Sequence, residues 1–444
     1  MDIIKEDMLS NSFGQELTLS PKRFSNPLII IGALFFVFGF VTWLSSVLIP
    51  YLQIACELNN FESYLVAFAF YISYLVMAVP SAWLLKITGF KKGMSYGLSI
   101  VALGSLIFIP AALTRTYSVF LIGLFVQGAG LALLQTASNP YVTILGPHES
   151  AARRISIMGI CNGIAGALAP VILGAVVLSN ADALVDQLTH MNGGEKTAAL
   201  QELARKVIVP YLVITAILIV LALVTYYSGL PEINEEPEDE TITNTVTTKT
   251  SIFQFPHLLL GVLTLFLYTG VEVIAGNTII SYGAYMGIPL STAKFFTSFT
   301  LISMLVGYVI GIICIPKYFS QRQALKMSSL LGIVFAVLAI FTNGIVSVLF
   351  VALLGLANSL MWPSIWPLAI ADLGKFTKIG SSLLVMAISG AAILPLVYGW
   401  ITDHANSQLA YWIVVPCYLV ICYYSIWGHT IRTNNSKTAG YVTP

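Results

Sequence analysis

Long apolar stretches, separated by short polar segments, follow one another along almost the whole chain. Most contain about 20 residues or more, the length that an α-helix needs to cross a bilayer. Twelve such spans are predicted, at residues 27–55, 64–85, 94–113, 117–145, 155–178, 208–228, 256–286, 293–315, 325–342, 346–371, 380–402 and 409–430. Backbone groups in lipid must be hydrogen-bonded within the protein, and the spans lack the alternating polarity of barrel strands, so each is predicted to be a helix.

The composition strengthens this prediction of an all-α membrane protein. Hydrophobic residues make up 57% of the chain and charged residues only 9%, whereas roughly a quarter of the residues of a soluble protein are charged. A net charge of +1 gives no indication of a nucleic-acid partner. The five cysteines lie within apolar stretches without metal-ligand spacing. They are interpreted as packing residues, and no metal site is expected.

Two long polar segments, residues 179–207 and 229–255, interrupt the series of spans. The second separates six spans from six. The predicted organisation is therefore an N-terminal tail, a six-helix bundle, a linker, a second six-helix bundle and a C-terminal tail, at residues 1–26, 27–228, 229–255, 256–430 and 431–444. No cleavable signal peptide is expected, because the first apolar stretch is too long for one.

The distribution of basic residues predicts the orientation. Cytoplasmic loops carry an excess of lysine and arginine. These residues gather in the loops after spans 2, 4, 8 and 10, as Lys86, Lys91, Lys92, Arg153, Arg154, Lys317, Arg322, Lys326, Lys375 and Lys378. Both termini and the 229–255 linker are therefore predicted to be cytoplasmic.

A weak internal repeat relates the two halves. Span 4 has Gln135 five residues before Pro140, and span 10 has Asn358 five residues before Pro363. Both segments are followed by Leu-Gly, at an offset of 228 residues, and the matched amides, prolines and glycines of spans 4 and 10 and of spans 5 and 11 recur at offsets of 223 to 225 residues. Small residues and prolines also serve helix packing, so a gating role for the two prolines stays open. In order along equivalent spans, the matches predict a duplicated six-helix unit of the major facilitator type, with substrate bound between the halves and alternating access.

Polar side chains inside the spans gather on spans 1, 4, 5, 7 and 10, and buried polar groups tend to mark a pathway. Amides and hydroxyls both donate and accept hydrogen bonds, as sugar hydroxyls do. An anionic substrate would favour arginine, and no arginine lies deep in a span. The alternative is that these groups join helices. The candidate substrate-binding residues are Trp43, Gln135, Asn139, Asn162, Asn277, Asn358 and Trp362.

Glu272 is the one carboxylate predicted to lie deep within a span. An ionised carboxylate at mid-membrane costs at least about 2.5–3.5 kcal/mol on insertion scales. A carboxylate placed at this cost is expected to have a function or a compensating partner. Glu272 is therefore predicted to be a proton site, a sodium ligand, a hydrogen-bond acceptor for sugar, or a carboxyl that packs helices together.

The chain resembles the fucose–galactose–glucose:proton symporter family of the major facilitator superfamily. The segments that carry the resemblance cover nearly all twelve spans, and they are residues 39–50, 134–147, 154–162, 270–273 and 362–370. The chain looks closest to the bacterial glucose/galactose branch, in which a glutamate matching Glu272 is usual. It is also similar to bacterial N-acetylglucosamine carriers. The resemblance implies a sugar-binding role for Gln135, Asn139 and Asn162.

The chain departs from the fucose-transporting members of that family at three places. It has Ser45-Ser46 where they have Asn-Asp, Gln135 where they have Glu, and Gly159 where they have Gln. The two acidic residues that the family uses for proton coupling are therefore absent. Coupling to H+, coupling to Na+ and uncoupled uniport all remain open.

The predicted function is import of a hexose, with glucose or galactose favoured, by a cation-coupled symporter without other cofactors. The alternatives are an N-acetylglucosamine carrier, a sugar uniporter, a drug exporter and a nutrient sensor that does not transport. An enzyme is not expected, because no hydrolase or metalloprotease motif occurs. The resemblance implies a monomer in the bacterial inner membrane, whose partners are the sugar and the lipid bilayer.

Overall fold

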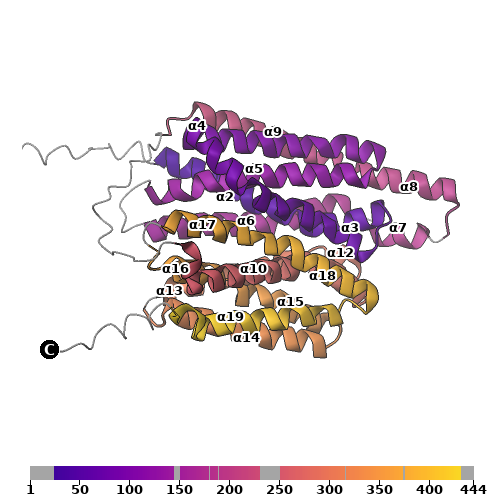
Figure 1. The fold of residues 1–444 in the computed structure, drawn as a ribbon. Helices are drawn as coiled ribbons and strands as arrows, with labels where there is room; N and C mark the ends of the chain where they lie inside the picture. The colour runs from indigo at the N-terminus through magenta and orange to yellow at the C-terminus, as the bar shows by residue number, and fades with distance from the viewer. Residues whose placement is uncertain are drawn as a thin grey trace, which may run out of the picture.

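The computed structural model describes residues 25–144, 151–179, 181–188, 190–230, 251–315, 317–373 and 376–431. Within these ranges the chain is almost entirely helical and contains no strand. Eleven of the described helices are long and apolar enough to cross a membrane. They run roughly side by side along one common direction (Figure 1). The prediction of an all-α membrane protein is confirmed.

The first half of the chain forms eight described helices. They are α2 (Ser25–Trp43), α3 (Ser45–Ala55), α4 (Asn60–Thr114), α5 (Tyr117–Ile144), α6 (Ala151–Val177), α7 (Ala181–Leu188), α8 (Gly193–Arg205) and α9 (Ile208–Tyr227). The short helices α7 and α8 occupy the polar 179–207 segment between spans 5 and 6.

The second half contains the remaining helices that the structure describes. They are η3 (Ile252–Gln254), α10 (Pro256–Asn277), α11 (Ile279–Tyr285), α12 (Leu290–Ala293), α13 (Phe296–Cys314), α14 (Gln321–Phe341), α15 (Gly344–Asn358), α16 (Met361–Ile370), α17 (Thr377–Met386), η5 (Ala387–Ser389), α18 (Gly390–His404), η6 (Leu409–Ile413), α19 (Val414–Ile426) and η7 (Gly428–Thr430). The predicted tails and most of the predicted linker lie outside the described residues.

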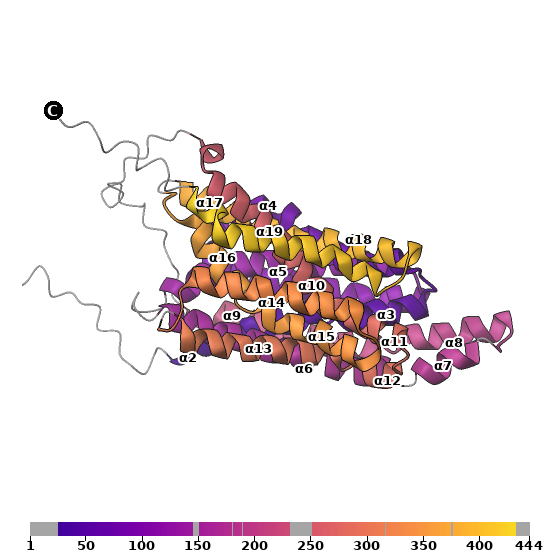
Figure 2. The same ribbon diagram turned by 90° about the horizontal axis from the view of Figure 1, so that it is seen from below.

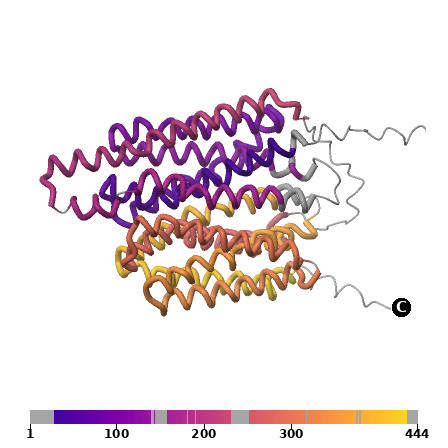
Figure 3. Tube along the Cα trace, turned by 180° about the vertical axis from the view of Figure 1, so that it is seen from behind, coloured from indigo at the N-terminus to yellow at the C-terminus, as the bar shows by residue number. Residues whose placement is uncertain are grey.

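The two halves lie side by side, with the indigo-to-magenta helices in one bundle and the orange-to-yellow helices in the other (Figures 1 and 3). The start of α2, the end of α9, the start of α10 and the end of α19 lie at one end, which we name the linker face. Helices α7, α8 and α12 lie at the opposite end, the α8 face (Figure 2). The interface between the bundles runs from one face to the other.

Predicted spans 2 and 3 are joined in the single helical segment α4, which is why eleven helices represent twelve spans. The backbone turns sharply at Gly89, where φ is 75° and ψ is 169°. This conformation is open to glycine but strained for residues with a Cβ. The glycine therefore lets two spans reverse direction without an intervening loop.

Predicted spans 1 and 7 are both interrupted in their second half, at Leu44 and at Thr278. Ser45 and Ser46 donate their hydroxyls to the carbonyls of Thr42 and Trp43, at 2.9 and 2.8 Å. Thr278 likewise donates to the carbonyl of Ile274 at 2.8 Å. Hydroxyl groups that bond to carbonyls of the preceding turn bend helices. Both interruptions thus coincide with hydroxyl side chains that bond to the preceding turn.

Close helix crossings repeat in the two halves. A Cβ on Gly128 of α5 would overlap the carbonyl of Phe70 on α4, and one on Gly355 of α15 would overlap the carbonyl of Thr300 on α13. Gly128 and Gly355 are 227 residues apart, close to the spacing of the sequence repeat. Glycine lets helix backbones approach this closely. The repeated crossings support a duplicated packing unit.

Helix α8 is fastened to the first half. The Tyr51 hydroxyl donates to the carbonyls of Leu203 and Ala204, each at 2.9 Å. Glu57 accepts from Lys196 at 2.6 Å. That hydrogen bond holds the pKa of Glu57 below its ordinary value, so the ion pair persists through neutral pH. Helices α7 and α8 therefore belong structurally to the first bundle.

The glycine crossing can be tested by thermal unfolding. In Gly128→Ala the new Cβ meets backbone that cannot move as a side chain does, and overpacking costs about 1–3 kcal/mol. We expect the purified variant to unfold at a temperature lower by about 2 °C or more. Gly159→Ala is the control, because a Cβ there meets no described atom within 4 Å. Equal unfolding temperatures for the two variants would contradict the crossing.

Candidate functional site

Glu272 lies on α10, deep in the protein, with part of its side chain still accessible. Tyr268 lies one turn earlier on the same helix, and its hydroxyl is close enough to the Glu272 carboxylate to interact with it. Tyr308 of α13 and Tyr418 of α19 lie within electrostatic range of that carboxylate. The carboxylate therefore lies in a setting of tyrosine hydroxyls rather than beside a described lysine or arginine.

The first half contributes a matching polar group on α4 and α5. Gln135 donates through Nε2 to the Tyr74 hydroxyl at 3.2 Å. The rings of Tyr74 and Tyr71 stack with centroids 6.3 Å apart, and Tyr71 lies within electrostatic range of Glu272. Polar groups thus run from Gln135 through the two tyrosines to Glu272, across the interface between the halves.

Several polar atoms near this run lack a partner. The Tyr71 hydroxyl is buried, and no described residue hydrogen-bonds to it. The same holds for the hydroxyl of Ser138, one turn after Gln135 on α5, and for Nδ2 of Asn358. An unpartnered buried polar group costs about 1–3 kcal/mol. Such groups need a further explanation, and a polar ligand would supply one.

Asn358 and Trp362 each contact a tyrosine that lies near Glu272. The Tyr418 hydroxyl donates to Oδ1 of Asn358 at 2.8 Å. The Trp362 ring lies 6.4 Å from the ring of Tyr268 and stacks on Trp366 at 5.4 Å, measured between ring centroids. These two predicted residues therefore lie one side chain away from the Glu272 carboxylate rather than directly on it.

Trp43 and Asn277 lie elsewhere, where the halves meet toward the α8 face. The Trp43 indole packs against Gly166 of the first half and so tightly against Gly276 of the second that a Cβ there would overlap it. Asn277 donates through Nδ2 to the Ser45 hydroxyl at 3.0 Å, again between halves. In this conformation both residues seal the interface, and the Asn277 amide is already partnered there.

Asn162 lies on α6, where its backbone packs closely against Gly39 of α2. On the same helix, Gly163 and Gly166 would contact Leu305, Leu301 and Trp43 if they carried a Cβ. One turn nearer the linker face, a Cβ on Gly159 would meet no described atom within 4 Å. The halves are therefore in contact toward the α8 face and leave open space beside α6 toward the linker face. The side chain of Asn139, also predicted for the site, is outside the described residues.

The sequence analysis missed the tyrosines Tyr71, Tyr74, Tyr268, Tyr308 and Tyr418. Their aromatic rings fit an apolar stretch, so the hydropathy pattern treats them as part of a span and does not register their hydroxyl groups. The available signal was the spacing of Tyr71 and Tyr74, three residues apart, and of Tyr268 and Glu272, four apart, because such pairs share a helix face. Among the described residues, no group of three or more His, Cys, Asp or Glu could hold a metal ion.

The comparisons with known proteins agree with this geometry. The family model for the Major Facilitator Superfamily matches residues 31–389. A glucose/galactose transporter of Brucella abortus is 33% identical over 414 residues, which cover 93% of this chain and 96% of the relative. The L-fucose-proton symporter of Escherichia coli is 31% identical over 414 residues, covering 92% of this chain and 94% of that protein.

Solved structures give the same result. The crystal structure of the transporter FucP in the outward conformation has a TM-score of 0.69 and 29% identity, covering 91% of this chain and 99% of that one. The D-xylose-proton symporter, at 15% identity and a TM-score of 0.66, shares the fold. The chain is a multi-pass membrane protein of the Major Facilitator Superfamily and belongs to its fucose–galactose–glucose:proton symporter family.

Proposed function

We propose that this protein imports a hexose by alternating access and that the polar run between Gln135 and Glu272 is its sugar site. The observation that carries the proposal is that both halves supply hydroxyl and amide groups to one place at their interface. Relatives named glucose/galactose transporter support glucose or galactose as the substrate. The named fucose symporter supports the same class of neutral sugar.

The chemistry of the site suits a sugar. Each sugar hydroxyl donates and accepts, and tyrosine hydroxyls and amides do both as well. The unpartnered Tyr71 hydroxyl and Asn358 Nδ2 are available for such bonds. Trp362, beside Tyr268, offers an aromatic face, to which the apolar face of a pyranose ring would pack. We include Asn162 and Asn139 in the proposed site because of the family resemblance.

We propose that the linker face is cytoplasmic, because the loops at that end carry most of the lysine and arginine. The structure then represents a state closed to the outside at Trp43, with open space beside Gly159 on the cytoplasmic side of α6. Bundles 27–228 and 256–430 would rock about the central site. We further propose a monomer in the bacterial inner membrane with both tails inside.

We assign Glu272 as the coupling group. A buried carboxylate needs compensation by a cation or a proton, and its neighbours are tyrosine hydroxyls. The relative named as a proton symporter favours H+. One charge moving down 100 mV releases about 2.3 kcal/mol, which supports roughly fiftyfold accumulation. The alternatives are coupling to sodium and uniport without coupling, and the next experiment distinguishes them from coupling to a proton.

Glu272→Gln keeps the shape and hydrogen-bonding capacity of the side chain but cannot release a proton. In liposomes with a pH gradient, we expect the parent protein to accumulate glucose and the variant to reach only equal concentrations on both sides. Exchange of labelled for unlabelled glucose should continue in the variant, because exchange requires no net coupling. Glu202→Gln, on the accessible surface of α8, is the matched control and should accumulate normally.

Three results would change this assignment. Gradient-driven accumulation that survives Glu272→Gln would remove Glu272 as the coupling residue. Accumulation by the parent protein under a sodium gradient alone would replace the proton with sodium. Equilibration under every gradient, with exchange intact, would establish uniport. Preference for N-acetylglucosamine over glucose in the same exchange assay would change the sugar but not the mechanism.

Tyr71→Phe tests the sugar site itself. The Tyr71 hydroxyl has no described partner, so its removal should leave thermal stability unchanged or slightly improved. If it bonds to sugar, glucose affinity should fall about threefold to tenfold, the equivalent of one ordinary hydrogen bond of about 0.5–1.5 kcal/mol. Titration of glucose in a thermal-shift or calorimetric assay measures both quantities.

The matched control is Tyr211→Phe. Tyr211 is also fully buried, but it stacks on Phe108 at 4.0 Å within the first bundle. Its substitution should leave glucose affinity unchanged. Equal affinity in the Tyr71→Phe variant and the parent would remove the Tyr71 hydroxyl from the site.

A further inference from the structure

Asp403 joins the two halves at the α8 face. It lies in the last turn of α18 in the second half. Its Oδ1 accepts from the backbone N–H of Asn60 at 3.1 Å and from Nδ2 of Asn60 at 2.7 Å. Its Oδ2 accepts from the N–H of Phe61 at 2.8 Å. These two N–H groups belong to the first turn of α4, where a helix has no internal partners for them.

Asp182 makes the corresponding contact in the opposite direction. It lies in α7 of the first half and accepts from the N–H groups of Leu290 and Ser291 in the second half, at 2.7 and 3.0 Å. Those residues begin the segment that leads through α12 into α13. Each half therefore extends one carboxylate to the backbone at the start of a span in the other.

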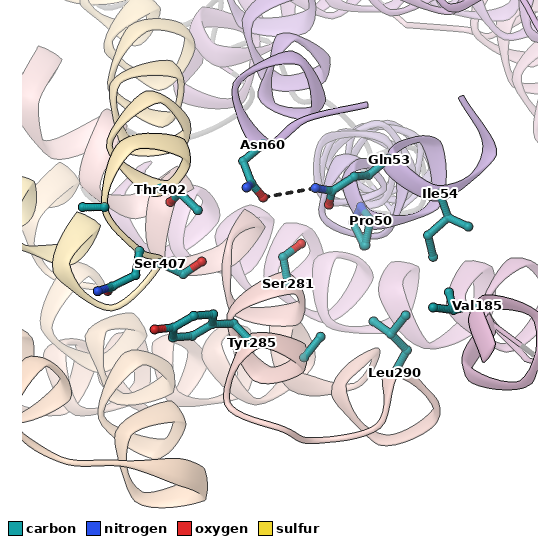
Figure 4. Close-up of a pocket in the computed structure, with 13 residues that line it drawn as sticks. Pro50, Gln53, Ile54, Asn60, Val185, Ser281, Tyr285, Leu290, Thr402 and Ser407 are labelled. Carbon is teal, nitrogen blue, oxygen red and sulfur yellow. Dashed lines mark hydrogen bonds between the residues drawn. The ribbon is translucent and has the colours of Figure 1, made fainter. Parts of the chain in front are cut away.

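The repeat relates the two contacts. Asp182 follows span 5 and Asp403 ends span 11, its equivalent. The recipients precede spans 2 and 8, which are also equivalent. Between the contacts lies a pocket of about 380 Å³ lined by both halves, with Asn60 and Thr402 near one contact and Val185 and Leu290 near the other (Figure 4).

Two polar residues that line this pocket have partners within the protein. Gln53 donates to Asn60 at 3.1 Å (Figure 4), and Thr402 donates to the carbonyl of Tyr398 at 3.0 Å. Below it, toward the interior, Ser45 and Asn277 close the interface. The pocket is thus the mouth of a pathway that is shut beneath it and bounded by the two carboxylate contacts.

We propose that Asp182 and Asp403 are a pair of latches that hold the halves together at the α8 face and set how readily the protein opens there. They are positioning residues, because neither contacts the central site. The proposal rests on the proposed alternating access, and it is independent of which sugar is carried. Removing a latch should favour the conformation that is open at the α8 face.

The Asp182 carboxylate stays ionised over the pH range in which its contact with the second half is needed. Burial raises its pKa, but the N–H groups of Ser291 and Leu290 and the charge of Lys294 outweigh that effect, so its pKa lies below the ordinary value. A carboxylate with a lowered pKa contributes its stabilisation at all higher pH values and loses it only as the pH falls through the lowered pKa. This latch therefore stays charged at neutral and mildly acidic pH.

Two cysteine reporters test the proposal in the full-length protein, with the five native cysteines replaced by alanine. Ser45→Cys lies at a position 2% exposed toward the α8 face. Gly159→Cys lies beside the open space toward the linker face. The purified protein in lipid nanodiscs exposes both faces to a water-soluble maleimide, and no sugar is added.

In Asp182→Ala or Asp403→Ala, we expect the labelling rate at Ser45→Cys to rise about threefold to tenfold, and to rise further in the double variant. At Gly159→Cys the rate should fall, by twofold or more in the double variant. Loss of structure would raise both rates, so the opposite changes separate a latch from a folding defect. Asp403→Asn, which retains one acceptor oxygen, should lie between parent and alanine variant.

Glu202→Ala, a change of an accessible carboxylate on α8 of the same face, should alter neither rate. Unchanged labelling at Ser45→Cys in the double variant would overturn the proposal, as would parallel increases at both reporters. Zero-trans uptake gives a second readout. A population shifted toward the α8-open state should lower the KM for external sugar and also lower the maximal rate. A reduced maximal rate with unchanged KM would argue against the latch.

Discussion

The constraint on which this structure depends is that a polar group inside a membrane-spanning bundle must find its partner within the protein. Water is absent from the surrounding hydrocarbon, so each unpartnered group is costly. Most of the interior hydroxyls meet this constraint locally, by donating to carbonyls one turn earlier, as Thr264 and Thr215 do. The groups that reach across between helices, or that remain without a partner, are therefore the informative ones.

Some of those exceptions join helices within one half, as Gln127 does with Ser105, and others lie where the two halves face each other. Ser45 reaches Asn277 across the interface, and Glu272 of the second half lies within electrostatic range of Tyr71 of the first. Within each half, close glycine crossings such as those at Gly128 and Gly355 join the helices, together with hydrogen bonds such as that from Tyr418 to Asn358. Each half is thus fastened internally by packing that is hard to change. The interface holds the polar groups that a ligand or a second conformation could engage.

The apolar pattern was sufficient to predict the helices, because twenty apolar residues in a row admit few other structures. It could not predict the interruptions at Leu44 and Thr278, because both lie within apolar stretches and hydropathy does not register a break in a helix. It also missed the tyrosines around Glu272, whose rings suit an apolar span and whose hydroxyls do not. Of the predicted site, Gln135, Glu272, Asn358 and Trp362 are brought into one neighbourhood by the fold. Trp43 and Asn277 instead lie in the seal, because the sequence cannot specify which conformation of a moving interface a structure adopts.

The contacts at the α8 face show why such an interface can be closed and still reopen. Asp182 and Asp403 bind backbone N–H groups, which every residue except proline supplies, so the receiving side leaves no trace in the sequence. Asp403 is exposed and Asp182 partly so, and solvent-screened contacts of this kind are individually modest. A shift of about 5.5 kcal/mol takes a two-state equilibrium from 1:99 to 99:1. The two carboxylate contacts and the packing of Trp43 together contribute a free energy within this range, which holds the α8 face closed. The free energy of sugar binding could offset that contribution.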